Sequence, residues 1–176
     1  MTLNIFLALL GVAFGYFFLY VKNFYFKALF FSLWLLFIPN TIYLVTDIEH
    51  FWGQFLKLSP IYQGILIGQY LTIIIIGIIT FCIGVYPLEK SLSKVWSQKR
   101  ALTINFLVLV NYLIALGVMM GRIERVNSWD VFIEPLNVIN SGFNLLISPP
   151  SLLLVLLYGS FCNILYFLFV ILKKHD

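Results

Sequence analysis

Charged side chains are scarce in this sequence. Eleven basic and seven acidic residues make up 10% of the 176 residues, whereas soluble domains carry about 25%. So few charges cannot cover the surface of a water-soluble fold of this length. A hydrophobic fraction of 62% and a mean hydropathy of +1.01 agree with that conclusion. We therefore exclude a soluble enzyme and predict that lipid surrounds most of the chain.

Cysteine and histidine are also rare, with two residues of each. Cys82 and Cys162 lie in separate apolar stretches, and two cysteines are too few for a disulfide framework. A zinc site would have to combine Asp47 and His50 with a third ligand, such as Asp130 or Glu49, so we expect no metal centre and no cofactor. Basic residues never form a run of five, which argues against a nucleic-acid partner.

Long apolar stretches are abundant. About 20 apolar residues are needed to cross the hydrocarbon core of a membrane, and five stretches qualify: 3–21, 28–46, 61–86, 102–121 and 151–172. We predict an all-α integral membrane bundle of about five helices forming one domain over residues 1–176. The first stretch lacks the flanks of a cleaved signal and is predicted to be a helix.

Two proline-containing regions modify this plan. Pro39 falls inside the second stretch, and because proline lacks an N–H we predict a kink there. Residues 131–150 are interrupted by three prolines and a glycine. This segment is too broken to span a membrane, so we predict that it lies at the outer interface or folds back into the bundle.

The positive charges predict an orientation. With five crossings, one side receives three basic residues, and the other receives eight: Lys22, Lys27, Lys90, Lys94, Lys99, Arg100, Lys173 and Lys174. Since basic residues favour the cytoplasmic side, we predict a multi-pass inner-membrane protein with its N-terminus outside and its C-terminus in the cytoplasm.

Three stretches contain glycines four residues apart: Gly11 with Gly15, Gly64 with Gly68, and Gly117 with Gly121. Such pairs let helices approach closely in lipid. They predict a tight bundle, and they leave open whether some of these faces join two copies of the chain in a homo-oligomer.

Polar residues concentrate at the predicted outer ends of two helices. Residues 39–50 read P-N-T-I-Y-L-V-T-D-I-E-H, where helical spacing places Asn40, Tyr43, Asp47 and His50 on one face. Residues 121–130 read G-R-I-E-R-V-N-S-W-D. They supply the remaining candidate ligand-binding residues, which are Arg122, Arg125, Asn127, Ser128, Trp129 and Asp130. We predict one cluster, with Asp47 or His50 within about 3 Å of Arg122, Arg125, Asn127 or Asp130.

The patterns P-N-x-x-Y-L-x-T-D-x-x-H and G-R-x-x-R-x-N-S-W-D resemble the bacterial multi-pass membrane proteins catalogued as domain of unknown function 1361. The likeness covers the chain from the second helix to about residue 135 by these motifs, and beyond them by hydropathy. Every motif position matches. The resemblance implies a small integral membrane protein without an assigned activity.

Two functions fit the predicted cluster. In the first, Asp47 pairs with an arginine to hold the bundle together, and the cluster presents a pocket to a membrane lipid headgroup, a small ligand or a partner membrane protein. In the second, Asp47 and His50 act as the acid-base pair of an outer-leaflet hydrolase or transferase, and an arginine holds an anionic group. A transporter fits less well, because the chain is small and an odd helix count does not divide into the inverted halves of many transporters.

Overall fold

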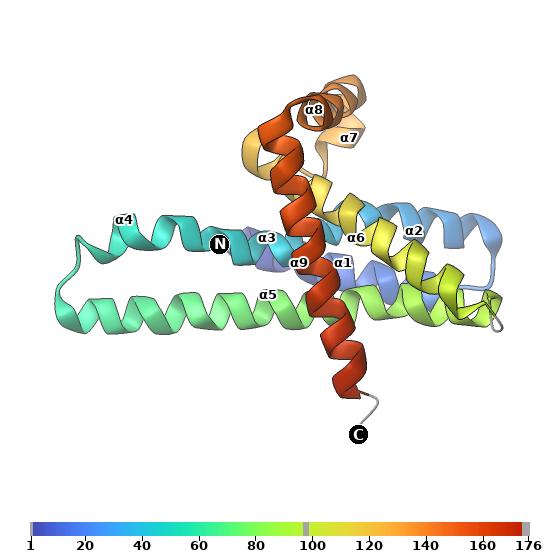
Figure 1. Cartoon of the computed structure of the whole chain (residues 1–176), viewed down its shortest axis with the longest axis horizontal. Coiled ribbons are helices and arrows are strands. Elements are labelled where there is room, and N and C mark those ends of the chain that lie inside the picture. Colours follow the sequence, from blue (N-terminus) through green and yellow to red (C-terminus); the bar gives the residue numbers. More distant parts are fainter. Residues whose placement is uncertain (1, 97–98, 174–176) are drawn as a thin grey trace.

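The structure is a computed structural model that describes residues 2–96 and 99–173. All regular secondary structure in the described part is helical, and five helical segments are long and apolar enough to cross a membrane (Figure 1). The predicted class, a helical membrane bundle, is confirmed. The elements are α1 (Thr2–Tyr20), α2 (Phe24–Phe37), α3 (Pro39–Thr46), the 3₁₀ helix η1 (Asp47–His50), α4 (Phe51–Phe55), α5 (Pro60–Val95), α6 (Arg100–Ile123), α7 (Asp130–Ile133), α8 (Pro135–Ile147) and α9 (Pro149–Lys173).

Two of the spans are longer than their hydropathy predicts. The second runs from Phe24 to Phe55 through α2, α3, η1 and α4, and the third continues through Pro87 to Val95. At 1.5 Å per residue, the 36 residues of α5 measure about 54 Å, against about 30 Å for the hydrocarbon core. The extra residues of the second span form α4, which makes a hairpin with the first turns of α5 at the left of Figure 1, and the extra residues of α5 lie at its other end.

The first three spans form one packed group. α1 lies against α2 and α5, and the buried Trp34 indole donates a 2.8 Å hydrogen bond to the carbonyl of Gly84 on α5. A Cβ added to Gly11 would lie 3.0 Å from the Ile38 backbone, and one added to Gly15 would lie 2.9 Å from the Trp34 ring. This glycine pair therefore serves contacts within the chain.

The last two spans are joined by amides and by an aromatic ring. Asn111 on α6 donates a 2.9 Å hydrogen bond to Oδ1 of Asn163 on α9. The ring of Tyr112 covers Gly159 so closely that an added Cβ would lie 2.1 Å from it. α9 crosses the other long helices steeply in Figure 1, and these two contacts fix where it meets α6.

The backbone around Pro39 stays close to helical. Ile38, which joins α2 to α3, keeps right-handed helical angles of φ −61° and ψ −31°. The side chain of Asn40 donates to the carbonyl of Phe37 at 2.9 Å, and that of Thr41 donates to the carbonyl of Ile38 at 2.7 Å. Side chains thus supply donors to carbonyls beside the proline. The kink at Pro39 stays a prediction.

The segment predicted to be interfacial forms α7 and α8. With 13 residues, α8 is about 20 Å long and too short to cross a membrane. It packs against the ends of α6 and α9, at the top of Figure 1, through buried Ser141 and Leu145. Its place at an outer interface stays a prediction.

Candidate functional site

The two sequence motifs meet because α3 and α6 lie side by side in a fixed register. A Cβ added to Gly117 would lie 2.7 Å from Cγ of Pro39, and one added to Gly121 would lie 3.3 Å from Cε2 of Tyr43. Both contacts join residues 78 apart (117 − 39 and 121 − 43). The two helices therefore run parallel, and successive turns of α3 face successive turns of α6. The absence of side chains at the two glycines permits this approach.

The second motif ends α6 and turns the chain back. Arg125 has φ 57°, in the left-handed region, and the N–H groups of Glu124 and Val126 both return to the carbonyl of Met120. The following turn is held by Asp130, whose Oδ2 accepts a 2.6 Å hydrogen bond from the Asn127 backbone N–H. The carboxylate of Asp130 therefore shapes its own loop.

The turned loop reaches α3 through Ser128. The side-chain amide of Asn40 donates to Ser128 Oγ at 3.0 Å, across 88 positions of sequence. This bond joins the two motifs directly. Trp129, at the start of α7, is half-buried beside it.

The loop closes a cavity of about 280 Å³, which we call the α3–α6 cavity. Its residues come from α1, the α2–α3 junction, α6, the loop, α7 and α8, and none of those the structure describes is charged. Most walls are apolar, including Leu7, Leu35, Leu116, Val126 and Val138. The polar lining residues are Asn4, Asn40, Tyr43, Asn127, Ser128 and Trp129.

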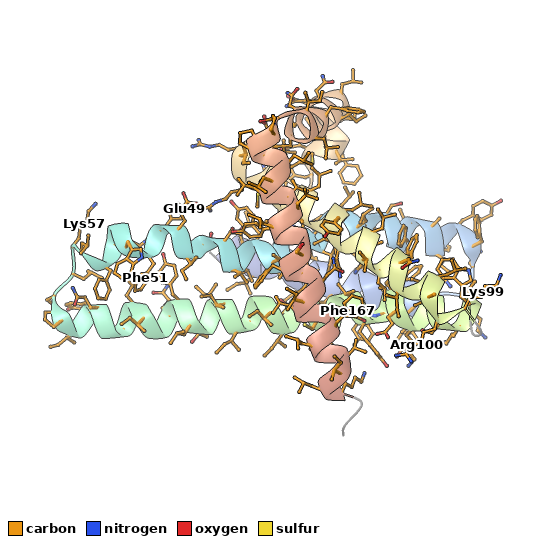
Figure 2. All side chains as sticks on the ribbon, in the orientation of Figure 1. Glu49, Phe51, Lys57, Lys99, Arg100 and Phe167 are labelled. Atoms are coloured by element: carbon orange, nitrogen blue, oxygen red, sulfur yellow. The ribbon has the colours of Figure 1, made fainter. Side chains whose placement is uncertain are left out.

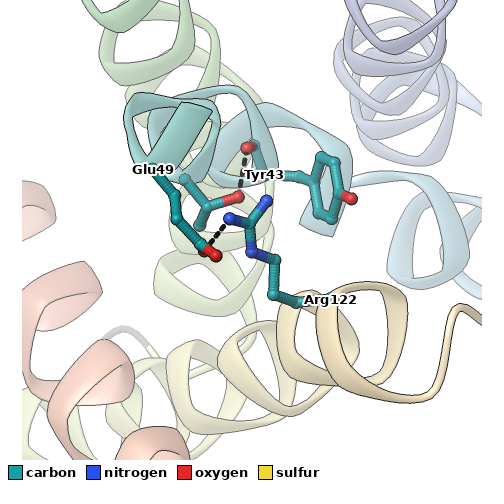
Figure 3. A network of polar contacts seen from close by, with 4 residues as sticks. Tyr43, Glu49 and Arg122 are labelled. Atoms are coloured by element: carbon teal, nitrogen blue, oxygen red, sulfur yellow. Dashed lines mark hydrogen bonds and ion pairs between the residues drawn. The ribbon is translucent and has the colours of Figure 1, made fainter. Parts of the chain in front are cut away.

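Several polar groups of this lining remain available, among them the Trp129 indole N–H, and two of them belong to α3. Asn40 uses its amide nitrogen for Phe37 and Ser128, and its Oδ1 accepts from no residue that the structure describes. The Tyr43 hydroxyl likewise makes no hydrogen bond within the described chain; Figure 3 shows it on the opposite side of Arg122 from Glu49. One acceptor and one donor can therefore serve a bound molecule.

The charged candidates lie outside the cavity. Arg122 forms an ion pair with Glu49, drawn in Figure 3, and Arg125 is exposed. Asp47 is buried, within electrostatic reach of Arg122 and of Tyr70 on α5, whereas His50 is exposed. No hydrogen bond or ion pair between described residues joins Asp47 or His50 to the second motif.

The register explains this arrangement. One turn beyond the contact of Tyr43 with Gly121, the 78-residue offset would set Arg125 opposite Asp47. α6 ends at Ile123, and the left-handed backbone of Arg125 directs the chain away before that turn is completed. Asp47 is thus left facing α5, and Arg122 pairs with the more exposed Glu49 instead.

From the sequence, Glu49 is a candidate only as a third metal ligand, not as the partner of an arginine, and the apolar lining is not a candidate. Glu49 carries a usable signal, because it is an acid in the first motif near the same helix end as Asp47. The lining residues carry none, since leucines and valines are found throughout the spans. Within the described part of the chain, no group of three or more His, Cys, Asp or Glu residues is placed to hold a metal ion.

The fold and the cavity together define a multi-pass α-helical membrane protein with a neutral pocket where the parallel helices α3 and α6 meet. The chain belongs to the family described as protein of unknown function DUF1361, whose model matches residues 3–165. No curated protein and no solved structure matches the chain.

Proposed function

We propose that this protein binds an amphipathic, membrane-soluble molecule with an uncharged polar head in the α3–α6 cavity. The observation that carries the proposal is the cavity itself, with apolar walls and a few convergent polar groups. That composition is typical of small-molecule sites. Its volume of about 280 Å³ suits a compact head and the first part of an apolar tail.

The polar groups of the cavity favour a neutral head. The available groups include the Asn40 carbonyl oxygen, the Tyr43 hydroxyl and the Trp129 indole N–H, which suit a ligand hydroxyl or amide. The arginine that could have bound a phosphate or carboxylate, Arg122, is paired with Glu49 outside the cavity. A neutral hydrogen-bonding head therefore fits better than the anionic headgroup that the two arginines suggested.

The cavity supports binding in preference to the alternative of an outer-leaflet hydrolase or transferase. A general base must lie within hydrogen-bond reach of the proton it removes. Asp47 and His50 are not among the residues that line the cavity. A molecule held there would meet amides and hydroxyls but no acid-base pair.

We place the cavity on the extracytoplasmic side of the inner membrane. The support is the distribution of basic residues, since eight of eleven belong to the opposite side of the five-span topology. A lipid of the outer leaflet, or a small amphiphile entering from that side, is then the expected ligand.

The test fills the cavity and asks what copurifies. Val138 lines the cavity from α8, whereas the next residue, Ile139, is 53% exposed and does not line it. We expect mass spectrometry of purified protein to find an organic molecule enriched with the parent and with Ile139→Trp, and lost with Val138→Trp. Equal retention by both variants, or no enrichment with the parent, would refute the proposal.

A second pair of variants tests the head of the ligand. Asn40→Leu removes the acceptor at the cavity, and we expect it to lower retention of the same molecule. Asn137→Leu makes the same change on the exposed part of α8, outside the cavity, and should not alter retention. If the enriched molecule carries a phosphate or carboxylate, the neutral-head assignment is wrong.

A further inference from the structure

A second cavity lies at the other end of α6. It has a volume of about 270 Å³ and is enclosed by the last turns of α5, the first turns of α6 and the second half of α9. Unlike the α3–α6 cavity, it contains one acid and one base, Glu89 and Arg100. Figure 2 labels Arg100 and Phe167, which belong to this lining.

Glu89 is held in place by a buried tyrosine. The hydroxyl of Tyr166, on α9, donates a 2.6 Å hydrogen bond to Glu89 Oε2, and Tyr166 is 0% exposed. A carboxylate has two oxygens and can accept further bonds. The other oxygen, Oε1, accepts from no described residue, so a fixed carboxylate with spare capacity faces the cavity.

Arg100 belongs to the same lining but does not neutralise Glu89. Among the described residues, no ion pair within 4.0 Å joins the two side chains, and the Arg100 guanidinium makes no other hydrogen bond there. Two other cations of this end, Lys90 and Lys173, lie over the Tyr86 ring, outside the lining. The cavity thus offers a separate negative and a separate positive group.

The beginning of α6 adds to the positive potential around Arg100. Arg100 is the first residue of this 24-residue helix, and no side chain caps the helix start. The first N–H groups of a helix attract anions. An anionic group beside the Arg100 guanidinium would interact with the guanidinium and with the free N–H groups at the start of α6.

We propose that this cavity binds an ammonium–phosphate zwitterion, with the ammonium on Glu89 and the phosphate on Arg100. Ile104, Phe167 and Val170 complete the lining with apolar surface, which suits the glycerol and acyl part of a lipid. The same head chemistry occurs in phosphatidylethanolamine and in free phosphoethanolamine. The proposal does not depend on the α3–α6 cavity, because the two linings share no residue.

The experiment compares lipids that differ only in the head. Purified full-length protein in detergent is titrated with phosphatidylethanolamine, phosphatidylcholine and phosphatidylglycerol of the same chains, and bound lipid is measured by native mass spectrometry. We expect phosphatidylethanolamine to bind about tenfold more tightly than the other two, since choline cannot donate to Glu89 and glycerol carries no positive charge. Equal affinity for the three lipids would overturn the proposal without any variant.

Matched variants assign the two ends of the zwitterion. Glu89→Gln keeps an acceptor for Tyr166, and we expect it to abolish the preference for phosphatidylethanolamine. Arg100→Gln should lower the affinity for phosphatidylethanolamine by about tenfold. The control Lys94→Gln removes an exposed charge of the same end that does not line the cavity, and it should leave binding unchanged. An equal loss for Lys94→Gln and Arg100→Gln would show surface charge alone and overturn the assignment.

Soluble phosphoethanolamine distinguishes the two sources of the head. If it displaces the lipid at millimolar concentration, the free zwitterion is a sufficient ligand. If it does not, the apolar part is required and the site is for the lipid. Either result keeps the head chemistry, which the lipid comparison tests separately.

Discussion

Arg122 lies near two carboxylates that differ in exposure. Its own side chain is 16% exposed, and its ion-pair partner Glu49 is 70% exposed. Asp47, within electrostatic reach, is buried at 7% exposure. Exposed ion pairs contribute about 0–1 kcal/mol to stability, whereas a buried charge that loses its compensation is costly. The two acids should therefore depend on Arg122 to different extents.

We expect Glu49→Gln to lower the free energy of unfolding by at most about 1 kcal/mol. Arg122→Gln should cost more, about 1–3 kcal/mol, because it also removes a positive charge within electrostatic reach of buried Asp47. Denaturant unfolding in detergent measures both, and the double variant gives the coupling energy. Equal costs for the two single variants would contradict this account of the pair.

At the scale of the element, the glycines of α5 divide into two kinds. Gly77 faces α3, where an added Cβ would lie 2.9 Å from the Thr41 carbonyl oxygen and 3.2 Å from Leu44. Gly64 and Gly68, in the hairpin part of the same helix, have nothing within 4 Å. Only the first kind is required by packing inside the chain, and a homo-oligomer through the glycine faces stays a prediction.

We expect Gly77→Ala to destabilise the fold by about 1–3 kcal/mol, since the backbone of α3 cannot yield to the methyl group as a side chain could. Gly68→Ala is the control on the same helix and should cause no loss, because alanine is the better helix former. Thermal melts of the purified variants compare them. A loss for Gly68→Ala as large as that for Gly77→Ala would reveal a neighbour beyond this chain.

Hydropathy predicted the spans well but their ends poorly. The number of crossings and the helical class followed from apolar runs. The extension of α5 through Pro87 to Val95 was missed because those turns carry Glu89, Lys90 and Lys94, which resemble a loop in composition. Leu88 and Ser91 of the same turns are nevertheless buried. Their face of the helix packs inside the bundle, and this packing keeps the helix continuous.

The meeting of the two motifs could be expected from the sequence, but the contacts of Asp47 could not. Helical spacing correctly brought Asn40 and Tyr43 to the face where the second motif arrives. The same spacing could not show where α6 stops. Whether Asp47 meets an arginine depends on the turn at Arg125. This turn requires a positive φ at a residue other than glycine, and the tertiary structure imposes that conformation. Local sequence carries little signal for such a residue.

For the whole molecule, orientation is the property that decides which solution each cavity faces. The positive-inside rule predicts that the region after Lys99 is cytoplasmic and the region after Ser128 is external. We expect a reporter inserted after Lys99 to be active only as a cytoplasmic probe, and one after Ser128 only as an external probe. The reverse pattern would place the α3–α6 cavity on the cytoplasmic side.

The division of the fold into two packed groups has a consequence for biogenesis. The contacts of α1 with α2 and α5, and of α3 with α5, all lie within the first 95 residues. Because chains fold from the N-terminus as they are made, these helices can associate while α6 is still in the ribosome. The α3–α6 cavity exists only after α6 and its reversing loop have been inserted. A ligand that enters during synthesis would therefore meet an open groove along α3, and the arrival of α6 would close it.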